Sequence, residues 1–318
     1  MKNTPKISAL FGSALVCAMA LPAVGAQLST DARSAIPKDV QQLIAVDYRA
    51  MQNSTTALDL KNRILPPELK QLEDALRTSG LNANHDVDEL AFASFRASGV
   101  DGTRMVGIAQ GQFDVTAIRA NWVKKKVKYT RIRTNRVYPM GASGMTVTFV
   151  SPTTMIFGSS EAVKSALDSR DGLNPSLLNN NEMMESMQAV DSEAVWSVLD
   201  QEGTQFMMHS VLGQAAQVTD YDAVKKRLLS SRYTMNFSNG VKFNLDVLTP
   251  DAFTAGTMAS LLNAAALYKK MSGTPTEKQA IENTTVRSNA DNLEVSFSAS
   301  DSQFVSLLQS PLFQAVVR

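Results

Sequence analysis

The sequence predicts an α+β protein of two similar halves, each a mainly antiparallel sheet with helices packed on one face. Three observations predict this class. Strand-like segments follow one another through short turns, as at Asn239-Gly240, which is typical of antiparallel hairpins. Capped helices stand between the hairpins instead of alternating singly with strands. The predicted elements also come in the same order before and after residues 171–181.

The N-terminus predicts a cleavable export signal. Lys2 and Lys6 form a basic region, and the apolar run that follows them is too short for a transmembrane helix. Val24 and Ala26 occupy the small-residue positions of a cleavage site. We therefore predict a signal peptide over residues 1–26, cleavage after Ala26, and a mature protein in the periplasm or outside the cell.

The first half is predicted over residues 36–170, after a polar stretch, 27–35, that we expect to be flexible. A strand is predicted around Leu43–Tyr48, followed by the helix "LPPELKQLEDALRTSG", whose prolines suit a first turn. The segments "DELAFASFRA" and "TRMVGIAQGQF" predict two strands joined by a turn. Asp114 is a helix N-cap for "VTAIRANWVKKK". Three further strands and the helix "SSEAVKSALDSRDG" complete this half.

The second half is predicted over residues 182–318, after a linker at 171–181 that is rich in turn-forming residues. It begins with the strand "EAVWSVLD" and two helical segments. A hairpin, a long helix opened by Asp251, a second hairpin and a closing helix follow. The segments "GQFDVTAI…WVKKK" and "LTPDAFTAG…LYKKM" occupy the same place in the two halves, which indicates an internal duplication.

Four stretches carry a resemblance to a known class: "IPKDVQQLIAVDYRAM", "GLNANHDVDELAFASF", "GQFDVTAI" and "TMIFGSSEAVKSAL". Their shared features are a proline-led entry into the first strand, an Asp-rich loop before the next strand and a Gly-Ser turn into a short helix. The pattern resembles exported bacterial α+β proteins of unknown function with an internal duplication, mainly over residues 36–170. The resemblance implies a duplicated protein of the bacterial envelope, and it implies no catalytic residue.

The composition excludes several kinds of site. Cys17 is the only cysteine and lies in the predicted signal, so the mature chain is expected to have no disulfide, thiolate metal site or cysteine nucleophile. A cysteine-free exported chain fits a bacterial envelope. Of 31 basic and 30 acidic residues, Lys2 and Lys6 leave with the signal, which gives 29 against 30 and a net charge of −1.

This balance bears on the partners. A near-neutral chain has no overall field that would attract nucleic acid or an anionic membrane. No second apolar run is long enough to span a bilayer. We therefore expect an envelope protein or a small ligand as the partner, no nucleic acid, no membrane span after signal cleavage and no cofactor.

No metal site is predicted. His85 and His209 are each alone in the sequence, whereas a zinc site needs a set of converging ligands. The segment 82–89, "NANHDVDE", has the alternating oxygen ligands of a calcium loop but lacks its glycine and its bidentate glutamate. Met183 and Met187 lie one helical turn apart, so we interpret them as core packing instead of soft-metal ligands.

The catalytic motifs of common hydrolases are absent. The sequence has no G-x-S-x-G, no serine–lysine pair at the penicillin-binding spacing and no H-E-x-x-H. Paired carboxylates stay open, because glycosidase-type catalysis needs only two of them at a suitable distance. The candidates near predicted strand ends are Asp47, Asp86, Asp88, Glu89, Asp200 and Asp246.

Residues 122–138, "WVKKKVKYTRIRTNRVY", contain seven lysines and arginines and no acidic residue. If they formed a basic binding patch, its members would be Lys124, Lys126, Lys128, Arg131, Arg133 and Arg136. We favour a helix end followed by a strand from Val127 onward. Lysines complement the negative end of a helix dipole, and charges on an edge strand discourage aggregation.

The sequence supports three hypotheses for function. The leading one is an exported, non-catalytic binding or scaffold protein of the bacterial cell envelope, with its ligand or partner surface between the two halves. The alternative is a carboxylate-dependent hydrolase that acts on envelope polymers. The third is a binder of anionic polymers through the basic stretch at 122–138.

Overall fold

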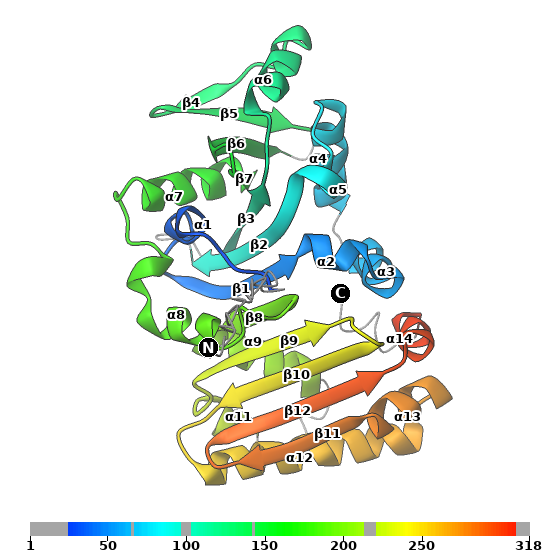
Figure 1. The fold of residues 1–318 in the computed structure, drawn as a ribbon. Helices are drawn as coiled ribbons and strands as arrows, with labels where there is room; N and C mark the ends of the chain where they lie inside the picture. Colours follow the sequence, from blue (N-terminus) through cyan, green and yellow to red (C-terminus); the bar gives the residue numbers. More distant parts are fainter. Residues whose placement is uncertain (1–24, 65–66, 97–102, 142–143, 213–220, 310–318) are drawn as a thin grey trace, which may run out of the picture.

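The computed structural model describes residues 25–64, 67–96, 103–141, 144–212 and 221–309. Its strands are β1 (Val40–Asp47), β2 (Val87–Arg96), β3 (Thr103–Gly111), β4 (Thr130–Ile132), β5 (Asn135–Met140), β6 (Met145–Ser151), β7 (Thr154–Ser159), β8 (Val195–Leu199), β9 (Ser230–Asn236), β10 (Val241–Leu248), β11 (Thr284–Asn289) and β12 (Asn292–Ala299). They form one twelve-stranded antiparallel sheet, in the order β11-β12-β10-β9-β8-β1-β2-β3-β7-β6-β5-β4 (Figure 1).

Helices flank this sheet. Those of the first part of the chain are α1 (Thr30–Ser34), α2 (Tyr48–Gln52), α3 (Thr55–Ile64), α4 (Pro67–Thr78), α5 (Ala83–Asp86), α6 (Val115–Lys124) and α7 (Ser160–Arg170). After the 3₁₀ turn η1 (Leu177–Asn179) come α8 (Asn181–Gln188), α9 (Gln201–Leu212), α11 (Tyr221–Lys225), α12 (Ala252–Ser272), α13 (Pro275–Glu282) and α14 (Asp301–Leu308). The α+β class and its antiparallel sheet are confirmed.

The regions before and after residues 171–181 meet at the antiparallel pair β1–β8, in which Leu43 lies opposite Val198. Outward from β1 the order is β2, β3, β7, β6, β5 and β4, and outward from β8 it is β9, β10, β12 and β11. Both residues of the central pair are buried. The two regions therefore share one sheet and part of one core.

Helices cover both faces of the first region, which corrects the expectation of helices on one face. In β7, Ile156 belongs to the core cluster that includes Val163 of α7, whereas Phe157 belongs to the cluster that includes Leu72 and Leu76 of α4. Successive residues of a strand point to opposite faces, so α7 and α4 lie on opposite sides of the sheet.

Strands β9–β12 of the second region follow the expectation of helices on one face. Strand β8 does not, because Val198 packs in one cluster with Met187 of α8, while Leu199 on its other face lies opposite Ser231, which bonds Thr204 of α9. On β10, Leu245 and Val247 pack in one cluster with Met258 of α12, while Lys242 and Asn244 on the opposite face are exposed. Helices α9 and α12 lie behind β9–β12 in Figure 1, and the strands present their other face uncovered. An antiparallel sheet with one solvated face is common.

Local signals positioned many of these elements correctly. Asp114 accepts a hydrogen bond from Ala117 N and caps α6, and Asp251 caps α12 in the same way. Asn239 and Gly240, with φ of 60° and 94°, turn β9 into β10. Asparagine and glycine tolerate the left-handed backbone conformation that hairpin turns need.

Residues 27–35, expected to be a flexible start, instead hold α1. Ser29 caps this helix, and Ala32 within it is fully buried. The predicted linker at 171–181 is also packed, since Leu177 is buried and its backbone N–H donates to Ile36 O at 2.7 Å. Both segments therefore contribute to the core.

The predicted signal peptide lies outside the described residues up to residue 24, as do 213–220 of the second half's helical segments and the end of its closing helix from residue 310. Among the described helices, none is both long and apolar enough to cross a membrane.

Candidate functional site

The candidate functional site is an apolar pocket between one face of the sheet and helices α2 to α5. It encloses about 550 Å³ of empty space, its open mouth included. Thirteen side chains line it, and ten of them are apolar. They are Tyr48, Lys61, Leu72, Glu73, Leu76, Leu81, Ala83, Val87, Leu90, Phe92, Ala109, Met155 and Phe157.

Strand alternation builds the floor of the pocket. Leu90 and Phe92 of β2 point to the face opposite Ala91, because successive side chains alternate. Phe92 meets Phe157 of β7 edge to face, with ring centroids 6.0 Å apart. Gly107 of β3 makes room for this pair, because a Cβ there would lie 2.2 Å from the Phe157 ring.

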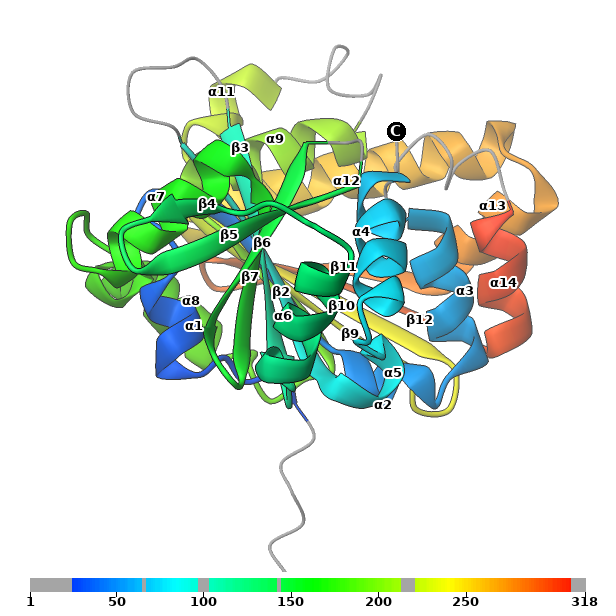
Figure 2. The same ribbon diagram turned by 90° about the horizontal axis from the view of Figure 1, so that it is seen from above.

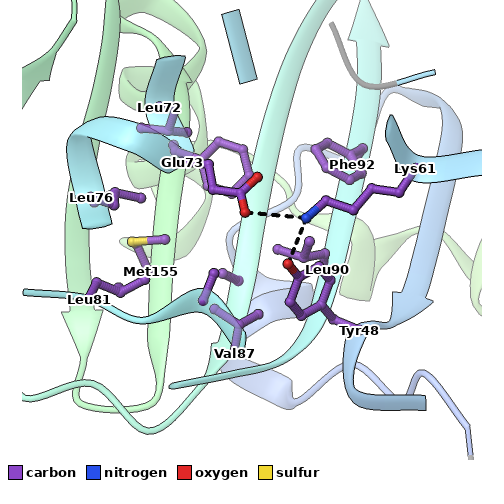
Figure 3. Close-up of a pocket in the computed structure, with 13 residues that line it drawn as sticks. Tyr48, Lys61, Leu72, Glu73, Leu76, Leu81, Val87, Leu90, Phe92 and Met155 are labelled. Atoms are coloured by element: carbon purple, nitrogen blue, oxygen red, sulfur yellow. Dashed lines mark hydrogen bonds and ion pairs between the residues drawn. The ribbon is translucent and has the colours of Figure 1, made fainter. Parts of the chain in front are cut away.

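Three polar side chains lie together in the pocket lining: Tyr48 from α2, Lys61 from α3 and Glu73 from α4. Lys61 Nζ donates to Tyr48 Oη at 2.7 Å and to Glu73 Oε1 at 3.3 Å (Figure 3). The ammonium also lies 4.8 Å from the centre of the Tyr48 ring, within the range of a cation–π contact.

The surroundings keep Lys61 positively charged. Partial burial disfavours the ammonium, but the hydrogen bond to Tyr48 and the negative charge of Glu73 outweigh that effect, so the pKa of Lys61 is raised. The Lys61 side chain is 18% exposed and that of Glu73 is 38% exposed. The cation is therefore held in the pocket, whereas its carboxylate partner is open to solvent.

Helix α3 is held from the far side by the second region of the chain. Thr56 donates to Asp301 Oδ1 of α14 at 2.6 Å, and Leu60 packs in the cluster that contains Phe304 and Leu308. Figure 2 shows α3 between α4 and α14. Lys61 thus extends from a helix that is fixed on both sides.

The basic residues predicted as a patch do not line this pocket. The structure places Lys124 at the end of α6 and Lys126 and Lys128 in the loop after it, all exposed. The strand predicted from Val127 begins at Thr130, as β4, and β4 is an edge strand of the sheet.

The three arginines of this set have separate surroundings. Arg133 is bound to Asp168 and Asp171 at 2.6 Å each. Arg136 lies 5.1 Å from the ring of Tyr129. Arg131 is exposed and pairs across the hairpin with Arg136. Lys124, Lys126, Lys128, Arg131 and Arg136 are thus exposed cations of the set, whereas the Arg133 guanidinium is engaged in two ion pairs within the protein.

The histidines and the calcium-like loop form no metal centre in the described part of the chain, where no group of three or more His, Cys, Asp or Glu could hold a metal ion. Asn82 caps α5, and its backbone N–H donates to Asp86 at 2.7 Å. The imidazole ring of His209 packs near Tyr221, with ring centroids 6.1 Å apart. Met183 and Met187 are buried in the core.

The candidate carboxylates are spread over the sheet. Asp47 lies directly opposite Glu89 in the β1–β2 pair, and Asp200 binds Arg96 at 2.6 Å. Asp88, one residue from Glu89, bonds Arg49. Asp246, also among the candidates, pairs with an arginine of β9 on the uncovered face. The structure thus brings only one facing pair together.

Burial, and then the charges of Asp47 and Asp88, raise the pKa of Glu89 to about 7. The segment at Gln27 lies over this carboxyl, since Gln110 donates both to Glu89 and to Gln27 O. The Asp47–Glu89 pair is therefore covered by the start of the described chain.

Sequence reasoning missed Tyr48, Lys61 and Glu73 as site residues. The segment of α3, "TTALDLKNRI", was not predicted as a helix, although its leucines and lysine fit a helical face. The available signal was a single lysine within a half-apolar segment, which by itself does not point to a pocket.

No protein-family model matches the chain, and no curated protein matches it. Among solved structures, crystal form I of TP0453, a bacterial protein from Treponema, has a TM-score of 0.52 at 11% identity and covers 88% of this chain and 97% of its own. Crystal form III has a TM-score of 0.51 at 11% identity and covers 89% and 99%. This likeness concerns the fold alone, and it agrees with a loose resemblance to a bacterial protein.

Proposed function

We propose that the protein is an exported, non-catalytic binding protein of the bacterial cell envelope, and that it holds a ligand with a long apolar portion in the pocket under α4. The observation that carries the proposal is the lining, in which ten of thirteen side chains are apolar. Small-molecule sites are typically concave, mostly apolar and equipped with a few converging polar groups.

Export is supported by the basic, apolar and small-residue order of residues 1–26. Internal duplication is supported by the strand order. Counted outward with β1 and β8 as the first strands, the third strands are β3 and β10. Each of them pairs on its outer side with the strand that comes last in its region along the chain, β3 with β7 and β10 with β12. A helix follows the third strand in both regions, α6 in one and α12 in the other.

The proposed ligand site lies within the first region instead of between the two regions. Its lining residues come from α2, α3, α4, α5, β2, β3 and β7, and Leu81 lies between α4 and α5. The sheet itself runs without interruption through β1 and β8, so the junction of the regions is a packed strand pair.

The alternative, a carboxylate-dependent hydrolase, has less support. Glu89 has a raised pKa, as a general acid needs. However, Gln110 binds both this carboxyl and the chain segment above it, so a polymer substrate would have to displace that segment. Loss of hydrolysis in Asp47→Asn and Glu89→Gln would be the evidence for this alternative.

A fluorescent, uncharged apolar probe such as N-phenyl-1-naphthylamine tests the proposal. Ala83 is half-buried at the edge of the pocket, so Ala83→Phe would fill the cavity without replacing a core residue. We expect this variant to weaken probe binding by about 10-fold or more, which corresponds to about 1.4 kcal/mol. Ala120→Phe, at an exposed position of α6, is the matched control.

The Ala83→Phe variant also distinguishes the pocket from other apolar surfaces that could bind the probe. Phe253, Leu267 and Met271 expose apolar side chains on α12, and a probe bound there would be unaffected by Ala83→Phe. Unchanged affinity in Ala83→Phe, or no probe binding by the wild type, would therefore refute the pocket as the ligand site.

A further inference from the structure

The polar corner of the pocket contains one cation whose hydrogen-bonding capacity is only partly used. The Lys61 ammonium has three N–H donors, and two of them are directed at Tyr48 Oη and Glu73 Oε1. The other ten lining side chains are apolar. A ligand that enters this pocket therefore meets one polar corner, formed by Lys61, Tyr48 and Glu73, and hydrocarbon over the rest of its surface.

The two partners of Lys61 are held with different strength. Tyr48 is only 4% exposed, and its hydroxyl lies 2.7 Å from the ammonium. Glu73 is 3.3 Å away, and its side chain is more than a third exposed. An ion pair with an exposed partner contributes little to stability, so Glu73 can turn into solvent at small cost.

The hydroxyl of Tyr48 offers a second donor at the same place. It accepts from Lys61, and its own proton is directed at Asn84 Oδ1 over a long distance of 3.4 Å. An anionic oxygen that replaced the Glu73 carboxylate could accept from both Lys61 and Tyr48. Hydrogen bonds from charged donors to anions are the stronger kind.

We propose that the ligand is a single-chain amphiphile with an anionic head, whose head displaces Glu73 and binds Lys61 and Tyr48 while its chain lies against β2 and β7. This inference rests on the proposed function, since it assumes that the pocket is the ligand site. Glu73 is then the counter-ion of the empty pocket, and Lys61 is the specificity-determining residue for the head. A carboxylate and a phosphate monoester share the required chemistry.

The test compares three ligands of equal chain length: dodecanoate, dodecyl phosphate and dodecanol, each below the concentration at which it aggregates. Their affinities are measured by displacement of the neutral fluorescent probe. For the wild type we expect at least one of the two anions to bind about 10-fold more tightly than the alcohol. The anion that binds better identifies the natural source as a fatty acid or a lipid phosphate.

Three variants assign this preference to residues. Lys61→Met keeps an unbranched apolar stem, and we expect it to lose the preference for anions while it still binds dodecanol. Tyr48→Phe removes only the hydroxyl, and we expect a smaller loss of the same preference. Glu73→Gln removes the competing carboxylate, and we expect it to bind the anions about fivefold more tightly.

The outcomes separate this inference from the proposed function. If none of the three ligands displaces the probe, the pocket is not a site for such chains and both ideas fail. If dodecanol binds as tightly as the anions in the wild type, or if Lys61→Met keeps the preference for anions, the anionic head is refuted while the apolar site stands. Dodecanol binding by Lys61→Met also shows that the variant is folded.

Discussion

The carboxyl of Glu89 predicts a measurable pH dependence of stability. Glu89 lies in β2 with Asp47 opposite it in β1 and Gln110 opposite it in β3. Gln110 Nε2 also donates to Gln27 O at 3.1 Å, and Gln110 Oε1 accepts from Ser29 N at 2.6 Å. Burial first, and then the nearby charges of Asp47 and Asp88, raise the pKa of Glu89 from 4.5 to about 7.

A raised carboxyl pKa means that the folded protein binds this proton more tightly than the unfolded chain does. The contribution of Glu89 to the free energy of unfolding is then fully present below pH 4.5 and is lost as the pH rises through about 7. The whole difference corresponds to about 3 kcal/mol. Solvent screening of this partly buried group reduces the expected loss to about 1–2 kcal/mol.

The perturbation is Glu89→Gln, which keeps the shape and stays neutral at every pH. Urea unfolding of wild type and variant at several values between pH 4.5 and 8 measures the effect. We expect the wild type to lose about 1–2 kcal/mol more than the variant over this range. Glu185→Gln, at an exposed position of α8, controls for the loss of one surface charge. Parallel stability curves for wild type and Glu89→Gln would refute the reasoning.

Substitutions at three further positions test the packing. Arg133→Ala removes two ion pairs to aspartates at α7 and should lower the free energy of unfolding in urea by about 1 kcal/mol. Arg133→Gly should lower it less, because the φ of 53° at this position favours glycine. Gly107→Ala places a Cβ 2.2 Å from the Phe157 ring and should destabilise by about 1–3 kcal/mol and weaken probe binding. In the uncleaved chain, which still carries Ala26, Trp196→Phe leaves Ala26 O without its buried indole donor at 2.9 Å and should lower the thermal midpoint, at a cost of about 1–3 kcal/mol.

Much of the fold was predictable because its signals are local. A capping aspartate and an Asn-Gly turn act through the backbone within a few residues of themselves, and Asp114, Asp251 and Asn239-Gly240 act as expected. The coverage of both sheet faces in the first region was not predicted. Yet β7, "TMIFGS", is buried from Thr154 through Gly158, and such a continuous apolar run is typical of a strand covered on both sides.

The candidate site was not predictable in the same way. Its residues come from seven elements between α2 and β7 and from Leu81 between two of them. Only the pairing of β2 with β3 and of β3 with β7 brings them to one place. The basic stretch at 122–138 was conspicuous because its charges are contiguous in the sequence. In the fold, Arg133 forms ion pairs within the protein, and the exposed lysines lie at and after a helix end. Lys61, by contrast, lies with Glu73 and Tyr48 in an otherwise apolar pocket lining.

The position of α3 explains why a pocket in the first region can depend on the second. Neighbouring residues of this helix serve different partners: Leu60 packs with Phe304 of α14, and Lys61 extends into the pocket. Thr56 fixes the same helix to Asp301 at 2.6 Å. Because core packing resists displacement, the backbone of α3 at Lys61 cannot move without shifting α14 as well. Only the Lys61 side chain can move independently. The closing part of the chain therefore helps to set the geometry of the proposed ligand head site.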